Sequence, residues 1–308
     1  MFRTQILTSP LFIDTVLSVF TLLILIGALL FFKRKSSAKY AATWTSWKSW
    51  LLLTPFVFLL LITTPPWPLV FLVLISLQSM KSFFQVTGMY HRSGFVWATY
   101  IVSIISAYYI KQDQILFLLI SPGLLMASIS LIPLIKNTAK NMIQYMSLSL
   151  MAFSFFAWSP LFLGKLLNQA EGVYLVLYMY ILSAFSVSTS TSLSKLLGKR
   201  YPFKNISSRI SVEGFFISGG LILMLSWKFQ GLITPYVEYY KQEAWIFCGL
   251  IIHTTSHLGR IIITVIKKDL GIKEVNLFAI SKQDTLSYMD KIIFTSPAFF
   301  ALYHYILN

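Results

Sequence analysis

The sequence predicts an all-α, polytopic integral membrane protein, built as a helical bundle of about nine to ten transmembrane helices. The 308-residue chain is 56% hydrophobic and only 11% charged, whereas about a quarter of the residues in an ordinary soluble domain are charged. Its mean hydropathy is +0.73, and apolar runs long enough to cross a bilayer recur along the whole chain. These observations exclude a soluble protein with a large core.

Each predicted helix is an apolar run, since a bilayer core about 30 Å thick needs roughly 17–25 apolar residues per helix. The predicted spans are 11–32, 49–63, 68–80, 93–110, 114–135, 142–167, 172–194, 210–227, 244–259 and 292–306. The first is too long for a signal peptide and no cleavage pattern follows it, so it is a retained span. The third is short and follows a proline cluster, which leaves open a broken or re-entrant helix. The ninth leaves open a continuation past Arg260 into the apolar residues 261–266.

Charge distribution predicts the topology. The chain has 25 lysines and arginines against 10 acidic residues. Most of these basic residues fall in alternate loops, namely 33–48, 81–92, 136–141, 195–209 and 260–291. By the positive-inside rule, these loops are cytoplasmic and the N-terminus is outside. The net charge of +15 then reflects topology and anionic lipid, so the expected partner is the phospholipid bilayer and not nucleic acid.

Two regions are predicted. Residues 1–141 form N-terminal transmembrane helices, and residues 142–308 form a C-terminal transmembrane region that carries the polar loops 195–209 and 260–291. Cys248 is the single cysteine of the chain, which excludes an intrachain disulfide and a cysteine-based metal site.

The C-terminal region carries the chemical signal. Segment 198–220, GKRYPFKNISSRISVEGFFISGG, is a basic turn followed by Glu213 and Gly214 at the entry to a span. Segment 258–300 leaves a span through the charged sequence KKDLGIKE and then enters the last span. Together they place cations and carboxylates on one membrane face. Lysines neutralise phosphate oxygens and carboxylates hold Mg²⁺, so this combination predicts a phosphate-rich ligand.

These segments resemble the phosphatidate cytidylyltransferase (CDP-diacylglycerol synthase) family, whose pattern reads roughly S-x-x-K-R-x-x-x-x-K-D, then P-G-H-G-G-x-x-D-R-x-D. The residues that fall on this pattern are Thr264, Lys267, Lys268, Lys273, Glu274 and Asp290. Those that fall on the family's upstream G-K/R and S-P-x-K-T-x-E-G segment are Gly198, Lys199, Arg200, Ser207, Ser211, Glu213 and Gly214. The N-terminal region resembles the family less specifically.

The resemblance implies a Mg²⁺-dependent enzyme of phospholipid biosynthesis in the bacterial cytoplasmic (inner) membrane. It would convert CTP and phosphatidate to CDP-diacylglycerol and pyrophosphate. The chain departs from the family at residues that this chemistry needs. Arg260 replaces an aspartate, Val187 falls where another aspartate is expected, and Ser287 and Tyr288 replace an Asp-Arg pair. A base in place of an acid repels Mg²⁺.

The predicted function is therefore a family member that has lost, or strongly weakened, cytidylyl transfer: a pseudoenzyme that serves as a non-catalytic lipid-binding or partner-binding subunit. The alternative is an active but divergent Mg²⁺-dependent phosphatidate cytidylyltransferase. Expected ligands are phosphatidate or another anionic phospholipid, and CTP. No cofactor is predicted unless the protein is active, when it needs Mg²⁺. The degenerate catalytic positions are Val187, Arg260, Ser287 and Tyr288.

The candidate binding residues follow from the same motifs. Those for phosphate or a lipid headgroup are Arg200, Arg209, Lys267, Lys268 and Lys273. The candidate metal ligands are Glu213, Asp269, Glu274, Asp284 and Asp290. Plainer interpretations stay open, since basic residues beside a membrane set its topology and loop carboxylates pair with lysines in solvent.

Two features of the spans have similar alternatives. His253 and His257 share a helix face, a spacing that can hold a metal, but no third ligand is evident, and hydrogen-bonded buried histidines are favoured. The serine- and threonine-rich run 183–194 favours close helix packing over ligand contact.

Overall fold

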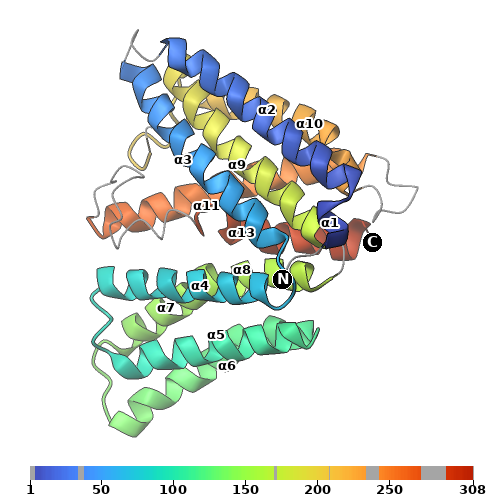
Figure 1. Cartoon of the computed structure of the whole chain (residues 1–308). Helices are drawn as coiled ribbons and strands as arrows, with labels where there is room; N and C mark the ends of the chain where they lie inside the picture. The colour runs from blue at the N-terminus through green and yellow to red at the C-terminus, as the bar shows by residue number, and fades with distance from the viewer. Residues whose placement is uncertain are drawn as a thin grey trace.

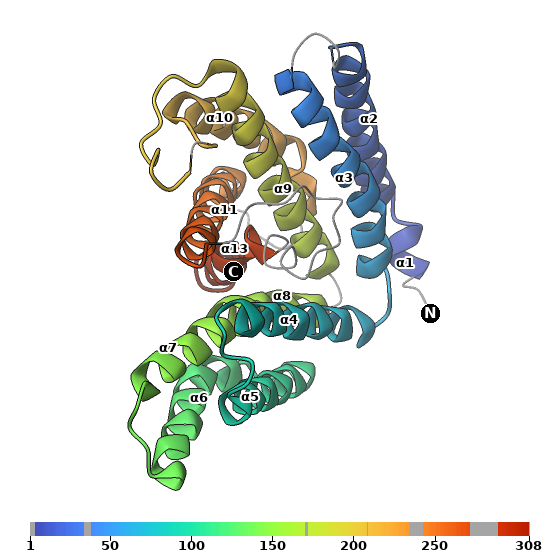
Figure 2. The same ribbon diagram turned by 90° about the vertical axis from the view of Figure 1, so that its left-hand side faces the viewer.

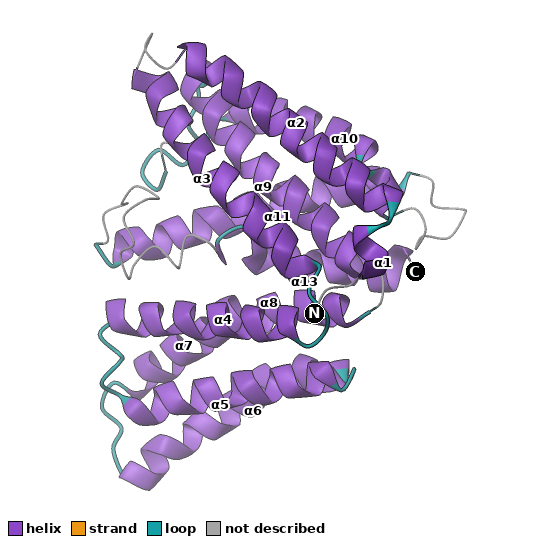
Figure 3. Ribbon diagram, in the orientation of Figure 1, coloured by secondary structure: helices purple, strands orange, loops and turns teal. Residues whose placement is uncertain are grey.

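The computed structural model describes residues 4–33, 38–169, 172–207, 209–233, 243–271 and 289–307. Helices are the regular elements of these residues, and no strand occurs among them (Figure 3). The helices are α1 (Thr4–Leu7), α2 (Pro10–Lys33), α3 (Ala38–Leu61), α4 (Trp67–Val86), α5 (Ser93–Lys111), α6 (Ile115–Lys136), α7 (Met142–Phe153), η1 (Ser154–Trp158), α8 (Ser159–Asn168), α9 (Gly172–Leu197), α10 (Val212–Lys228), η2 (Gln230–Leu232), α11 (Ala244–Asp269), α13 (Ile292–Ala301) and η5 (Leu302–Leu307). The predicted all-α class is confirmed.

Seven helical segments in the described residues are long and apolar enough to cross a membrane. They are Pro10–Phe32, Trp67–Val86, Ser93–Lys111, Ile115–Lys136, Met142–Asn168, Gly172–Leu197 and Ala244–Asp269. The protein is therefore a multi-pass membrane protein. Helices α3, α10 and α13–η5 occupy the places of the other three predicted spans.

Two helices differ from the predicted spans. The segment predicted as 68–80 is a full helix of 20 residues, α4, and not half of a broken pair. Its Pro68 lies in the first turn, where a missing N–H costs no hydrogen bond. Helix α11 continues past Arg260 to Asp269, which confirms the longer of the two alternatives for the ninth span, because the apolar run 261–266 extends the helix. The first ten residues of segment 260–291 are therefore helical.

The helices form two groups that meet at α8 (Figures 1 and 2). Helices α4 to α7 lie on one side, and α2, α3, α9, α10, α11 and α13 lie on the other. Helix α8 packs against both groups, and every residue from Ser159 to Leu167 is buried. A helix without a solvent- or lipid-facing side belongs in a core. Both groups contain helices from before and after residue 141, where the sequence predicted a division.

Successive long helices run in opposite directions, with α7, η1 and α8 forming one continuous segment. Helices α2, α4, α6, α9 and α11 end on the left-hand side of Figure 1, and α3, α5, α7 and α10 begin there. The connections that carry most of the basic residues therefore join helices at the same end of the molecule. This agrees with the alternation on which the predicted topology depends.

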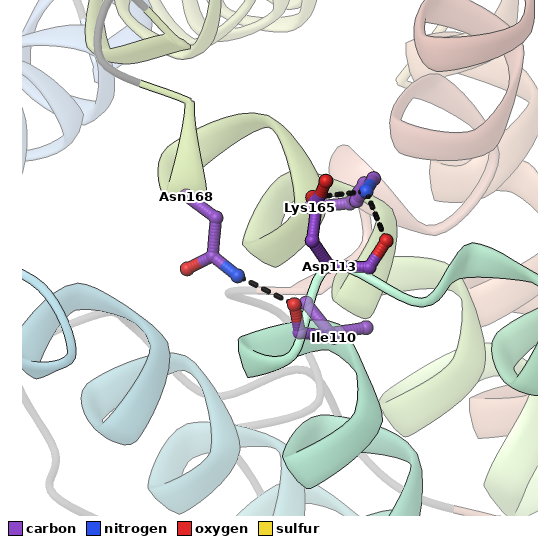
Figure 4. Close-up of polar contacts among 4 residues, drawn as sticks. All are labelled: Ile110, Asp113, Lys165 and Asn168. Carbon is purple, nitrogen blue, oxygen red and sulfur yellow. Dashed lines mark hydrogen bonds and ion pairs between the residues drawn. The ribbon is translucent and has the colours of Figure 1, made fainter.

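A buried lysine of α8 contacts the turn between α5 and α6 (Figure 4). Lys165 Nζ donates a hydrogen bond to the main-chain oxygen of Asp113 (2.8 Å) and forms an ion pair with its carboxylate. Asn168 Nδ2 donates to the carbonyl oxygen of Ile110 (2.6 Å). Asp113 has φ 64°, so the α5–α6 turn presents its carbonyl groups to α8. The end of α5 is thus capped by α8 side chains.

We expect Lys165→Met to lower the free energy of unfolding by about 1–3 kcal/mol, because the α5–α6 turn loses a charged donor in a buried site. The measurement is thermal unfolding of the detergent-solubilised protein. Lys111→Met is the matched control, since Lys111 is exposed at the same end of α5. Equal unfolding temperatures for the two variants would contradict the capping role.

Candidate functional site

The candidate site forms where α11 meets residues 289–291, which lead into α13. The two segments touch at Gly259, where a Cβ atom would lie 2.1 Å from the main-chain oxygen of Asp290. Helix α11 continues for ten residues beyond Gly259, a distance of about 15 Å along its axis. Asp290 therefore lies alongside the helix and not beyond its end, and it is only 9% exposed.

Basic side chains gather around this contact. The charges of Arg260, Lys291 and Lys267 act on Asp290. Arg209, at the exposed edge, interacts with Arg260 and Asp290, and Lys195 at the end of α9 interacts with Arg209 and Arg260. We call these six residues the basic cluster: Lys195, Arg209, Arg260, Lys267, Asp290 and Lys291. Among the described residues, it sets five basic groups against one carboxylate.

Burial in this cluster shifts pKa values toward the uncharged form of each group. It raises the pKa of the Asp290 carboxyl, while the neighbouring cations Arg260, Lys291 and Lys267 act in the opposite direction. Desolvation lowers the pKa of Lys291 to about 8, although the negative charge of Asp290 opposes this change. Several basic side chains close together create a positive potential that attracts anions. The cluster therefore favours an anionic ligand.

Three buried polar atoms in and near the cluster have no hydrogen-bond partner among the described residues. Asp290 Oδ1 is buried and has no hydrogen-bond partner among the described residues. The same is true of Ser190 Oγ and of Nδ1 of His257. Buried polar atoms are normally hydrogen-bonded, and exceptions in native structures often mark a functional group or a missing water or ligand.

A serine–histidine network lies next to the cluster, between α9 and α11. The Ser186 hydroxyl is 2.8 Å from His253 Nδ1 and 3.3 Å from His257 Nε2, and His253 Nε2 is 3.2 Å from the carbonyl oxygen of Phe215. A carbonyl accepts only, so Nε2 of a neutral His253 carries the proton and Nδ1 accepts from Ser186. The prediction of buried, hydrogen-bonded histidines is confirmed.

The serine-rich face of α9 packs closely against α10. A Cβ atom on Gly214 would lie 2.1 Å from Ser194 Oγ, and the main-chain N–H of Ser211 donates to that oxygen (2.8 Å). Small residues let two helices approach to this distance. The predicted packing role of the serine and threonine run is confirmed here, and Val187, within that run, is buried at 1% exposure.

Glu213 has a local partner set. Its carboxylate accepts hydrogen bonds from the main-chain N–H groups of Lys199 (3.0 Å) and Arg200 (3.2 Å). This carboxylate holds the basic turn against the first turn of α10, where negative charge also offsets the helix dipole. Both carboxylate oxygens of Glu213 thus accept main-chain hydrogen bonds, which gives this residue a structural role.

The structure brings together some of the predicted site residues. Arg209, Arg260, Lys267 and Asp290 belong to the basic cluster. The side chains of Arg200, Lys268 and Asp269 are exposed, and Lys268 Nζ donates to the carbonyl oxygen of Asn205 (3.2 Å). The predicted candidates that lie outside the described residues are Lys273, Glu274, Asp284, Ser287 and Tyr288.

Two members of the cluster were missed by the motif comparison. Lys291 directly follows the matched Asp290, so its position in the sequence was a usable signal. Lys195 belongs to no matched motif, and its proximity to Arg260 depends on how α9 and α11 pack. Sequence order alone does not reveal that second contact.

The resemblance implies Mg²⁺, which we tested against the described residues. No group of three or more His, Cys, Asp or Glu side chains among them is placed to hold a metal ion. Asp290 is the one carboxylate in the described cluster, and it faces Arg260, Lys267 and Lys291. Mg²⁺ binds through carboxylates and substrate phosphates, and surrounding cations repel it. The described residues do not fit Mg²⁺.

Comparisons with known proteins give the family. The model of the "Cytidylyltransferase family" matches residues 44–306. A protein of Escherichia coli (strain K12) named "Uncharacterized protein YnbB" is 22% identical over 253 residues, covering 80% of this chain and 83% of that protein. No solved structure matches the chain. Since the family model spans most of the sequence, including the basic cluster from α9 to α13, the chain belongs to the cytidylyltransferase family.

Proposed function

We propose that this protein binds the phosphate group of an anionic phospholipid at the basic cluster and does not catalyse metal-dependent cytidylyl transfer. It serves as a non-catalytic, lipid-binding subunit in phospholipid metabolism. The observation that carries the proposal is the charge of the cluster, where five basic groups face one carboxylate among the described residues. A phosphate monoester supplies about two negative charges and three acceptor oxygens.

Arg260 is central to this proposal. Its guanidinium stands next to Asp290 at a sequence position where the resemblance expects an aspartate. A guanidinium matches phosphate with two parallel hydrogen bonds, so it supports binding. It does not supply the open coordination positions with which a metal aligns two phosphates for transfer. Binding of phosphate without transfer follows from this substitution.

The alternative is an active, divergent phosphatidate cytidylyltransferase. The retained Asp290, with one carboxylate oxygen unpaired among the described residues, is the observation that favours it. That oxygen is available to a cation or to a donor group on a ligand. An activity measurement separates this alternative from the binding function.

The positive-inside rule supports an orientation with the basic cluster at the cytoplasmic face and the N-terminus outside. The similarity to an Escherichia coli protein supports the bacterial cytoplasmic membrane as its location. A protein partner in a membrane complex would then meet the lipid-binding site from the cytoplasm.

The activity assay uses the purified protein in vesicles with labelled CTP, phosphatidate and Mg²⁺. We expect no CDP-diacylglycerol above the protein-free control, because each 1.4 kcal/mol lost from transition-state stabilisation is tenfold in rate and the acids at positions 187 and 260 are missing. The double variant Val187→Asp, Arg260→Asp tests whether restored acids restore transfer. Formation of CDP-diacylglycerol by the unaltered protein would refute the proposal.

The binding assay uses dihexanoylphosphatidate and isothermal titration calorimetry in detergent. Arg209→Gln should weaken binding about tenfold or more, because a hydrogen bond to a charged group contributes about 1.5–3 kcal/mol. Lys204→Gln, in the same loop and exposed, is the matched control. Affinity should be equal in EDTA and in Mg²⁺. A requirement for Mg²⁺, or equal effects of the two substitutions, would contradict binding by the basic cluster.

Binding should also depend on pH. We expect the affinity to fall as pH rises from 7 to 9, because Lys291, with a pKa of about 8, loses its positive charge in this interval. The second phosphate pKa is about 6, so the ligand itself keeps its charge. Lys291→Gln should bind more weakly at pH 7 and lose this pH dependence. A pH profile that Lys291→Gln leaves unchanged would rule out Lys291 as the titrating group.

A further inference from the structure

A groove lies between α4 and α5. Its volume is about 290 Å³. Leu74 and Leu77 of α4 and Ile104 of α5 line it, and Leu74 and Ile104 are 55% and 51% exposed. Both helices are among the seven that can cross a membrane. Exposed apolar residues on such helices face lipid, so the groove opens to the hydrocarbon region.

One end of the groove is polar. Gln78, Lys81, Trp97 and Tyr100 also line it. Lys81 lies one to two turns before the end of α4, and Trp97 lies one turn after the start of α5. These residues are therefore close to the membrane face at which α4 ends and α5 begins. Tryptophan and long basic side chains commonly occupy this interfacial depth.

Two polar groups at this end have no partner within the described part of the chain. Lys81 is exposed and forms no ion pair with any described carboxylate. The Tyr100 hydroxyl is buried and makes no hydrogen bond to a described group. A buried hydroxyl without a partner costs free energy. A ligand with acceptor oxygens would satisfy both groups.

We propose that this groove binds one anionic phospholipid. Its phosphate contacts Lys81, an oxygen of its glycerol or ester region accepts a hydrogen bond from Tyr100, and an acyl chain lies along Leu74, Leu77 and Ile104. The arrangement of cation, hydroxyl donor and apolar wall follows the order of groups in a phospholipid. This site is separate from the basic cluster, because its residues belong to α4 and α5 and the cluster belongs to α9, α11 and the adjoining loops.

The test is native mass spectrometry of the full chain released from nanodiscs that contain equal amounts of phosphatidylglycerol and phosphatidylethanolamine. We expect the unaltered protein to retain phosphatidylglycerol preferentially. Lys81→Gln should lower this preference about fivefold, as expected for one basic residue near an anionic lipid. Lys136→Gln is the matched control, because Lys136 is an exposed lysine at the corresponding end of α6. It should leave the preference unchanged.

A second pair of variants tests the apolar wall without changing charge. Ile104→Trp should obstruct the groove and reduce the retained lipid, whereas Ile101→Trp should not, although both isoleucines lie on α5 and are 51% exposed. Equal retention within either pair overturns the proposal. Arg209→Gln should keep the groove lipid. Loss of the lipid in Arg209→Gln but not in Lys81→Gln would place it at the basic cluster and refute the groove site.

Discussion

The contact between α11 and residues 289–291 at Gly259 determines the geometry of the candidate site. A side chain at this position would collide with the main chain of Asp290, and α13 could no longer begin beside the middle of α11. The same contact brings Asp290 next to Arg260, Lys267 and Lys291. From there α13 continues into the core, where the Ser159 hydroxyl of α8 donates a hydrogen bond to the carbonyl oxygen of Ile293. The close approach at Gly259 therefore lets one segment, residues 289–301, contact both the charged cluster and the buried helix α8.

The resemblance expects an acid at position 260, where this chain has Arg260. In a metal site, carboxylates concentrate negative charge to hold a cation, and the cation then holds the phosphates. At Arg260 the positive charge is covalently part of the protein. In the function proposed above, such a site would attract phosphate directly without a metal, and it would lack the coordination chemistry that a metal provides. Membership of the cytidylyltransferase family is therefore compatible with the proposed function.

Polar groups inside the bundle have two different roles. Ser186, His253 and His257 form a hydrogen-bonded network that joins α9 and α11, and Lys165 caps the α5–α6 turn from within α8. These hydrogen bonds hold helices together, although Nδ1 of His257 has no partner among the described residues. Asp290 Oδ1 and the Tyr100 hydroxyl, in contrast, have no partner among the described residues. Their environments differ: the Asp290 oxygen lies among basic side chains and can accept from a donor group, whereas the Tyr100 hydroxyl lies in an apolar groove near Lys81 and can donate.

The sequence by itself determined the all-α membrane class, the positions of the helices and the basic residue at position 260, because hydropathy and residue identity are properties of short segments. It did not predict the full length of α4, which continues beyond its apolar run to Val86. Nor could it show that Lys195 meets Arg209 and Arg260, that α8 is buried on all sides, or that α4 and α5 leave a groove. Only the tertiary structure decided these features. They depend on how closely helices from distant parts of the chain pack, and small residues such as Gly214 and Gly259 set that distance.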